Sequence, residues 1–271
     1  MSSLVLNLPV VDEKVNGVVL YDGPSLFDGK RIVVIATGLD PNKSKNEKTG
    51  KMVQTWIMVA GTPPVEALDK GKDSSVCGSC KHRHFRSCYV NLGIGGPYQV
   101  YEAWKNNKYP TLDMSDPLAM LVFKDKHVRL GSYGDPACVP IDIWNTITHW
   151  CAGHTGYTHA WKRISTEYRK FCMASCDTLD EVNQAKARGW KPFYVRQPED
   201  PIPDKFFTCP ASKEDGYRLS CQECMVCSGG NYKVGKGVPT IVVHGPSWKR
   251  SFFLRGMKLM RNKKKYVGQF N

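Results

Sequence analysis

The sequence predicts an α/β fold, with a β/α barrel-like domain, a β-rich N-terminal extension and cysteine-ligated metal sites. The main observation is that β-branched runs alternate with helical segments over residues 127–245, which favours a parallel sheet or a barrel. A second is a group of strand-like runs in the first 60 residues. A third is the clustering of the 11 cysteines.

The N-terminal region, residues 1–73, contains runs typical of strands. VNGVVLYDG and RIVVIATGLD are rich in β-branched residues and end in turn residues. The polar loop DPNKSKNEKTGK then leads to a third predicted strand, MVQTWIMVA. We expect a hairpin or a small sheet here, with the lysine-rich loop exposed.

Residues 74–247 form the predicted barrel-like, metal-binding domain. Its predicted helices are 96–110, 140–151 and 178–189, and its predicted strands are 127–136, 170–178, 190–196, 206–212 and 240–245. In the third helix, Thr178 is a suitable N-cap with Glu181 three residues on, and Gly189 is suited to end the helix. In such an architecture the functional groups lie at the carboxyl ends of the strands.

The basic tail, residues 248–271, carries much of the formal net charge of +13. It contains eight cations and no acid: Lys249, Arg250, Arg255, Lys258, Arg261, Lys263, Lys264 and Lys265. Phosphate backbones attract such a segment because counterions are released on binding. The sequence therefore predicts a nucleic-acid partner, with DNA favoured, or a nucleotide substrate; the alternative is a solvated tail that aids solubility.

The expected location is the cytoplasm. The longest apolar runs fall well short of the ~20 residues that cross a bilayer. The first fifteen residues carry acids where a secretory signal carries lysines. An odd number of cysteines also argues against a complete set of disulfides. We expect no membrane partner.

The strongest motif is the C-terminal cysteine set, Cys209-x11-Cys221-x2-Cys224-x2-Cys227. Four thiolates at this spacing are able to close a tetrahedral zinc site, or to hold an iron–sulfur cluster. His244 is an alternative fourth ligand in place of Cys209. Packing alone rarely produces such spacing, so we predict metal ligation.

The N-terminal cysteine set is Cys77-x2-Cys80-x7-Cys88, with His82 and His84 inside the loop. Three cysteines and one histidine would form a closed zinc knuckle that staples the fold. Three cysteines without a fourth ligand would leave a metal position open to substrate or cofactor. Both alternatives remain open. The other four cysteines, Cys138, Cys151, Cys172 and Cys176, are expected to be structural.

Two aspartates follow predicted strands, where a β/α architecture places its chemistry. Asp135 follows the glycine-rich turn of Gly131, Ser132 and Gly134, and Asp177 ends the next strong strand. We predict Asp135, Asp177 and His159 as catalytic, and the turn as substrate-binding. The alternative is that both aspartates are turn or helix-cap residues.

Aromatic and basic residues are interleaved in the segment GHTGYTHAWKR. Tyr157, Trp161 and Arg163 are predicted to bind substrate, because base stacking and phosphate contact require such side chains. Packing of Tyr157 and Trp161 in the core is an equal alternative. The zinc-deaminase signature is absent from the sequence.

Several motifs together resemble a family of bacteriophage-encoded proteins of unassigned function. The matching stretches are KTGKMVQTWI, VCGSCKHR…SCYVN, RLGSYGDPACVP, TGYTHAW, MASCD and CPAS…CQECMVCSGG, within residues 48–230. The resemblance implies a phage or prophage origin and a β/α domain.

Two further resemblances imply different chemistries. The C-terminal cysteines before a histidine are similar to the zinc site of guanine transglycosylases, with CxxCxxC in place of CxCxxC. The three early cysteines ending in Cys88-Tyr89 before a β/α region resemble radical S-adenosylmethionine enzymes, with C-x2-C-x7-C in place of CxxxCxxC. The leading hypothesis is a phage metalloenzyme that modifies nucleic acid or a nucleobase, with base exchange of the guanine transglycosylase type favoured. The alternatives are an iron–sulfur enzyme using S-adenosylmethionine and a non-enzymatic, zinc-stabilised module that binds nucleic acid or a host protein.

Overall fold

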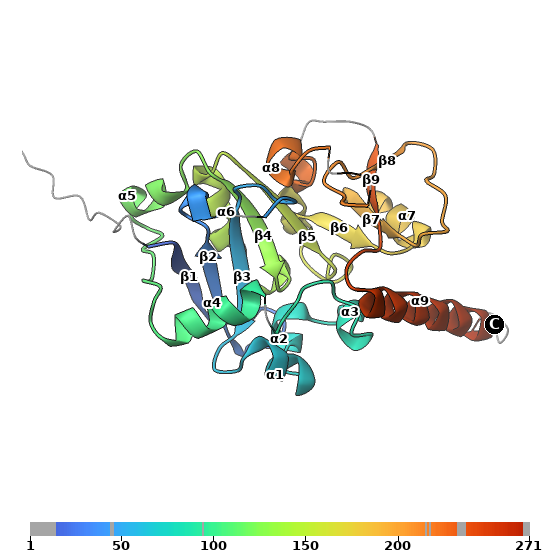
Figure 1. Ribbon diagram of the computed structural model, residues 1–271, viewed down its shortest axis with the longest axis horizontal. Coiled ribbons are helices and arrows are strands. Elements are labelled where there is room, and N and C mark those ends of the chain that lie inside the picture. The colour runs from blue at the N-terminus through green and yellow to red at the C-terminus, as the bar shows by residue number, and fades with distance from the viewer. Residues whose placement is uncertain are drawn as a thin grey trace, which may run out of the picture.

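The computed structural model describes residues 15–267 except 44–45, 94, 215, 217 and 232–236. Its centre is a nine-stranded sheet in the order β1-β2-β3-β4-β5-β6-β7-β9-β8 (Figure 1). The strands are β1 Gly17–Pro24, β2 Arg31–Thr37, β3 Val53–Val59, β4 His127–Tyr133, β5 Gly153–Thr158, β6 Met173–Cys176, β7 Pro192–Arg196, β8 Phe206–Thr208 and β9 Val238–Val242.

The first three strands are antiparallel, and every pairing from β3 onward is parallel. The mixed α/β class is therefore confirmed. Among the described strands the sheet ends at β1 and β8, so closure into a barrel is not seen. β3 pairs with β4 across the predicted boundary at residue 73, which places the β-rich extension in the same sheet.

The predicted N-terminal strands are confirmed, and β2 shows why they form. Its residues Ile32 to Ala36 are completely buried, as expected of a β-branched run in the centre of a sheet. β5 was not predicted as a strand, because GHTGYT has no β-branched run. Parallel pairing with β4 and β6 on its two sides holds it in the sheet.

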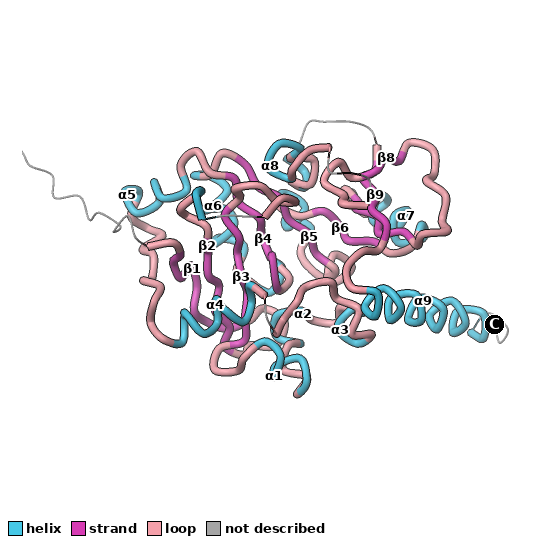
Figure 2. Tube along the Cα trace, viewed as in Figure 1, coloured by secondary structure: helices cyan, strands magenta, loops and turns pink. Residues whose placement is uncertain are grey.

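Helices α1 to α8 lie in the connections between strands β3 to β9, and α9 follows the last strand. They are α1 Pro64–Asp69, α2 Ser74–Cys77, α3 Lys81–His84, α4 Gly96–Lys105, α5 Pro117–Met120, α6 Ile141–Trp150, α7 Leu179–Ala187, α8 Cys221–Cys224 and α9 Ser247–Val267. The predicted cap of α7 is confirmed, since Thr178 Oγ1 accepts from the Glu181 backbone N–H at 3.1 Å. Long loops with little helix join β7, β8 and β9 (Figure 2).

The predicted basic tail is largely the helix α9. This helix begins beside α3 and extends away from the sheet (Figure 1). Phe253 and Met257, on its first turns, are buried in a cluster with Val243. The described part of the chain has no helix with the length and apolar character needed to cross a membrane.

The register of the parallel strands creates a continuous wall on one face of the sheet. Arg129 pairs with Thr155, Tyr157 with Met173, and Ser175 with Phe193. Because side chains alternate between the two faces of a strand, one face collects a defined set of residues. These are Arg129, Gly131, Tyr133, Tyr157, Ser175, Phe193, Val195, Ile241 and Val243, and all of them line one cavity.

Candidate functional site

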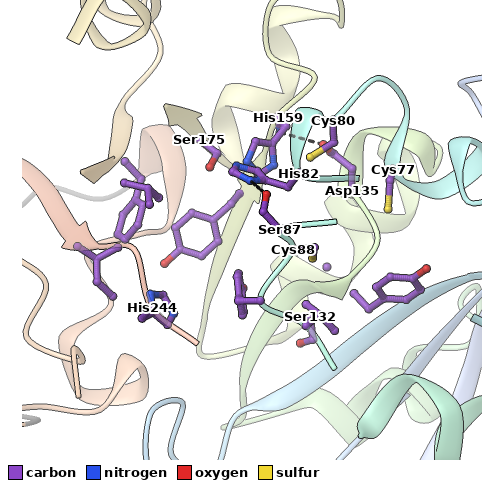
Figure 3. A pocket seen from close by; sticks show the side chains of 18 of the residues that line it. Cys77, Cys80, His82, Ser87, Cys88, Ser132, Asp135, His159, Ser175 and His244 are labelled. Carbon is purple, nitrogen blue, oxygen red and sulfur yellow. Dashed lines mark hydrogen bonds between the residues drawn. The ribbon is translucent and has the colours of Figure 1, made fainter. Parts of the chain in front are cut away.

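The cavity on this face has a volume of about 180 Å³ and receives residues from both cysteine sets. Cys77, Cys80 and Cys88 gather on one side of it, and His244 lies on the other (Figure 3). The C-terminal set contributes Cys209 and Cys221. In Figure 1 the helices α2 and α3 lie at one end of the strands and α8 lies at the other. The cavity therefore extends between the two sets.

The N-terminal cysteine set belongs to the long connection after β3, at the carboxyl edge of the sheet. Cys77 ends α2, Cys80 precedes α3, and Cys88 follows it. Burial raises the pKa of all three thiols, that of Cys88 to about 11, and the other thiolates of the set raise the pKa of Cys77 further. The three sulfurs are thus close enough to interact, in an environment that disfavours free thiolates.

Asp177 anchors this cysteine loop to the sheet. Its side chain is completely buried, and its Oδ2 lies 2.7 Å from Lys81 Nζ and 3.1 Å from His82 Nε2. Burial alone would raise the pKa of Asp177, but His82 and Lys81 outweigh this effect and hold it well below its usual value. Lys81 also pairs with Glu181 of α7 at 2.9 Å. Asp177 is absent from the residues that line the cavity.

His82, His159 and Asp177 form the one group, among the described residues, with three metal-ligand atoms within 4.8 Å of one another. This group could hold a metal ion. Against this, Lys81 already neutralises the Asp177 oxygen that faces His82, and a second cation there would be repelled. The grouping includes neither cysteine set, so a cysteine-ligated centre is not seen in the described residues.

The C-terminal cysteine set is held by backbone hydrogen bonds. The Cys209 N–H donates to Thr240 O of β9 at 2.7 Å, and the Cys221 N–H donates to Lys48 O at 2.8 Å. Ser220 caps α8 through a reciprocal capping box with Glu223. Burial raises the pKa of Cys209, Cys224 and Cys227, and the neighbouring thiols raise it further.

His244, the alternative ligand, has both ring nitrogens engaged elsewhere. Nδ1 lies 3.2 Å from Val242 O, and Nε2 lies 3.1 Å from Lys48 Nζ. Burial and the Lys48 charge lower the pKa of His244 to about 4. The imidazole is therefore neutral and accepts a hydrogen bond from Lys48 at pH 7.

The glycine-rich turn after β4 lines the cavity, but its aspartate is occupied. Asp135 accepts from the backbone N–H groups of Ala137 at 3.0 Å and His159 at 2.9 Å, one on each oxygen. Gly131 has φ +65°, and a Cβ there would lie 2.6 Å from Gly134 O, so only glycine fits. Ser132 also lines the cavity and donates to Gln54. Asp135 therefore acts as the turn and cap residue of the alternative prediction.

The aromatic segment is divided between the cavity and the core. Tyr157 lines the cavity and stacks edge-on against Phe193 at 5.0 Å. Trp161 is buried away from the cavity and donates to Ser175 O at 3.1 Å. The exposed Arg163 donates to Ser79 Oγ in the N-terminal cysteine loop at 2.8 Å.

The predicted nucleic-acid residues of α9 differ in exposure. Arg250, Arg255 and Lys258 are exposed. Lys249 is instead 7% exposed, and its Nζ donates to Val90 O at 2.6 Å. The side chains of Arg261, Lys263, Lys264 and Lys265 lie outside the described part of the structure.

The cysteines outside the two sets lie in the interior. Cys138, Cys172 and Cys176 are completely buried, and Cys151 is half-buried, with its Sγ 3.3 Å from Gly153 O. None of the four lines the cavity.

The sequence prediction missed two cations of the cavity, Arg129 and Lys48. Arg129 lies within β4 and is 7% exposed, and Lys48 belongs to the loop before β3. The one available signal was an arginine between the apolar residues Val128 and Leu130 of a predicted strand.

No family model, no curated protein and no solved structure matches this chain.

Proposed function

We propose that this protein is an iron–sulfur enzyme of the radical S-adenosylmethionine type. The observation that carries the proposal is the position of Cys77, Cys80 and Cys88. They lie in the connection that follows β3, the first strand of the parallel series, and line a cavity on one face of that series. Active sites of β/α proteins are formed by the loops at the carboxyl ends of parallel strands.

The residues of the N-terminal set fit such a cluster. Thiolates around one zinc ion stand about 3.8 Å apart, because each Zn–S bond is about 2.3 Å long and the geometry is tetrahedral. The three sulfurs do not all lie within 4.8 Å of one another, so they are not spaced as ligands of a single zinc ion. The set has three cysteines, so a fourth iron would face the cavity.

The chain's own residues position and enclose this site. The turn from Gly131 to Asp135 brings backbone groups to the cavity wall, and Asp135 locks that turn to His159. Lys81 and His82 hold the cysteine loop on Asp177, and Phe253 of α9 stacks on the His82 ring at 5.4 Å. A cluster bound there would supply the electron for reductive cleavage of S-adenosylmethionine.

The residues that line the cavity support nucleobase exchange less well than radical chemistry. Base exchange requires a carboxylate free to attack a sugar carbon. Asp135 is the one carboxylate among the described residues of the cavity wall, and backbone N–H groups occupy both of its oxygens. Asp177 is bound through Oδ2 to Lys81 and His82, and it does not line the cavity.

Protein purified without oxygen tests the proposal. We expect a brown protein that contains iron and sulfide and that, after reduction with dithionite, converts S-adenosylmethionine to methionine and 5′-deoxyadenosine. Iron analysis, the visible spectrum and chromatography of the products provide the measurement. A colourless protein that contains only zinc, with S-adenosylmethionine left intact, would contradict the proposal and favour base exchange or a binding module.

We further propose that α9 binds nucleic acid. The described part of this helix presents Arg250, Arg255 and Lys258 to solvent, and α9 has no acidic residue. Its first turns cannot be removed without loss of packing, because Phe253 and Met257 are buried. Charge neutralisation is therefore a cleaner test than truncation.

The triple variant Arg250→Gln, Arg255→Gln, Lys258→Gln is expected to bind a fluorescent DNA duplex more weakly. Loss of three phosphate contacts should reduce the slope of log K against log[salt] by about 2.7. Fluorescence anisotropy over a range of salt concentrations measures both quantities. The matched control replaces the exposed Lys105, Lys108 and Lys124 with glutamine. Equal effects in the two triple variants would indicate binding governed by net charge alone.

A further inference from the structure

Arg129 is a buried cation without a carboxylate partner among the described residues. Arg129 is 7% exposed, and no carboxylate of the described residues lies within ion-pair distance of its guanidinium. A guanidinium has five N–H donors and stays charged in proteins. One donor, on Nη2, reaches Tyr89 Oη at 3.0 Å, and the Tyr157 ring lies 5.5 Å from the guanidinium carbon.

A second cation, Lys48, lines the same cavity. Its Nζ donates to the neutral imidazole of His244 at 3.1 Å, which leaves its charge unpaired in the described structure. His244 in turn contacts the Tyr89 ring at 5.3 Å. Four separate segments thus bring Arg129, Lys48, Tyr89 and His244 together. Burial of charge without a partner is unfavourable, so such an arrangement indicates a site that a ligand completes.

Arg129 and Lys48 lie at the border between the cavity and a neighbouring hollow. Lys48, Tyr89, Arg129 and Ser132 also line a second, more open hollow of about 230 Å³, so they lie where the two spaces meet. The Lys48 carbonyl accepts from the Cys221 N–H, which places this region beside the C-terminal cysteine set. Cys77, Cys80 and Cys88 line the same cavity on the side away from His244 (Figure 3).

We infer that the substrate of this cavity carries a carboxylate or phosphate group, which binds to Arg129 and Lys48 between the two cysteine sets. The inference rests on the proposed function, because it concerns the substrate of that same site. A planar guanidinium binds two oxygens of either group side by side, and Lys48 and Tyr89 supply further donors. An anion held there leaves the rest of the substrate to extend toward the N-terminal cysteine set.

The test uses the anaerobically purified full chain, titrated with inorganic phosphate or acetate at constant ionic strength and followed by calorimetry. We expect at least one of the two anions to bind the unmodified protein. Arg129→Met should weaken that binding about tenfold to a hundredfold, since charge-assisted hydrogen bonds are lost. Without added anion, Arg129→Met should melt no lower than the unmodified protein. Arg188→Met, which removes an exposed arginine that does not line the cavity, should bind like the unmodified protein.

Each outcome has a defined meaning. Phosphate binding alone indicates a phosphorylated substrate, and acetate binding alone indicates a carboxylate. No binding, or equal binding by Arg129→Met and the unmodified protein, would overturn the inference. If Arg129→Met does not fold, Arg129→Lys and Lys48→Met replace it, and each should weaken binding. Loss of S-adenosylmethionine binding in these variants would assign the site to that molecule's own carboxylate and also overturn the inference.

Failure of this inference is distinguishable from failure of the proposed function. Anion binding is measured by heat and does not depend on iron, sulfide or turnover. A zinc protein that binds phosphate through Arg129 would keep the anion site and exclude the radical chemistry. A brown protein that cleaves S-adenosylmethionine, with no anion bound at Arg129, would support the radical chemistry and exclude the anion site.

Discussion

Replacement of Asp177 with asparagine is expected to lower the free energy of unfolding by about 3 kcal/mol, the lower end of the range for breaking a buried ion pair. The Asp177 side chain is completely buried, and those of Lys81 and His82 are 17% and 12% exposed. The amide cannot neutralise the Lys81 ammonium. The loss stays at the lower end because Glu181 still pairs with Lys81 at 2.9 Å.

Chemical denaturation of the variant measures this loss, with Asp69→Asn as the control. Asp69 also forms an ion pair of similar length, 2.8 Å, with Arg86, but the two side chains are 60% and 46% exposed. Exposed pairs typically contribute less than about 1 kcal/mol. If both variants lose the same stability, the anchoring role of Asp177 is wrong.

Replacement of Cys88 with alanine is expected to abolish cleavage of S-adenosylmethionine and to remove about half of the bound iron, if each cysteine set holds one cluster. Cys88 lines the cavity with Cys77 and Cys80, so the loss affects the set that faces the proposed reaction. Cys227→Ala should remove the other half of the iron. Iron content and 5′-deoxyadenosine formation measure the two effects separately.

Cys151→Ser is the matched control for both cysteine variants. Cys151 belongs to neither set, is half-buried, and has its Sγ 3.3 Å from Gly153 O, a contact that a hydroxyl can keep. Iron content and product formation should be unchanged. Full turnover by Cys88→Ala, with all iron retained, would rule out the N-terminal set as the reactive centre.

Features of this protein that depend only on residues close together in the sequence could be predicted from it. The α7 cap at Thr178, the end of that helix at Gly189 (φ +74°) and the β-branched strand β2 are local in this sense. β5 was missed, because pairing with two neighbouring strands forms it rather than its own composition. The burial of Lys249 was missed for the same reason, since its partner Val90 lies 159 positions away.

The sequence predicted which cysteines belong to the two sets of the candidate site. It did not predict how the strands bring these sets and the other cavity residues together. The spacing of the cysteines marks both sets, because short gaps let thiols of one loop face a common centre. The shared cavity depends on the register of β4 to β9 and on which face each strand presents. Arg129 shows the limit: a shift of one residue in β4 would place its side chain on the other face of the sheet.

The contact of α9 with the N-terminal cysteine loop has a consequence for how the protein is assembled. Phe253 stacks on His82, Gly256 approaches the Phe85 ring so closely that a Cβ would collide with it, and Lys249 holds Val90. In the sequence, α9 comes after all the other segments that line the cavity. During translation it therefore leaves the ribosome after those segments. The N-terminal cysteines are then uncovered for an interval of synthesis, and an iron–sulfur cluster of the proposed kind would have that interval to assemble before α9 packs against the loop.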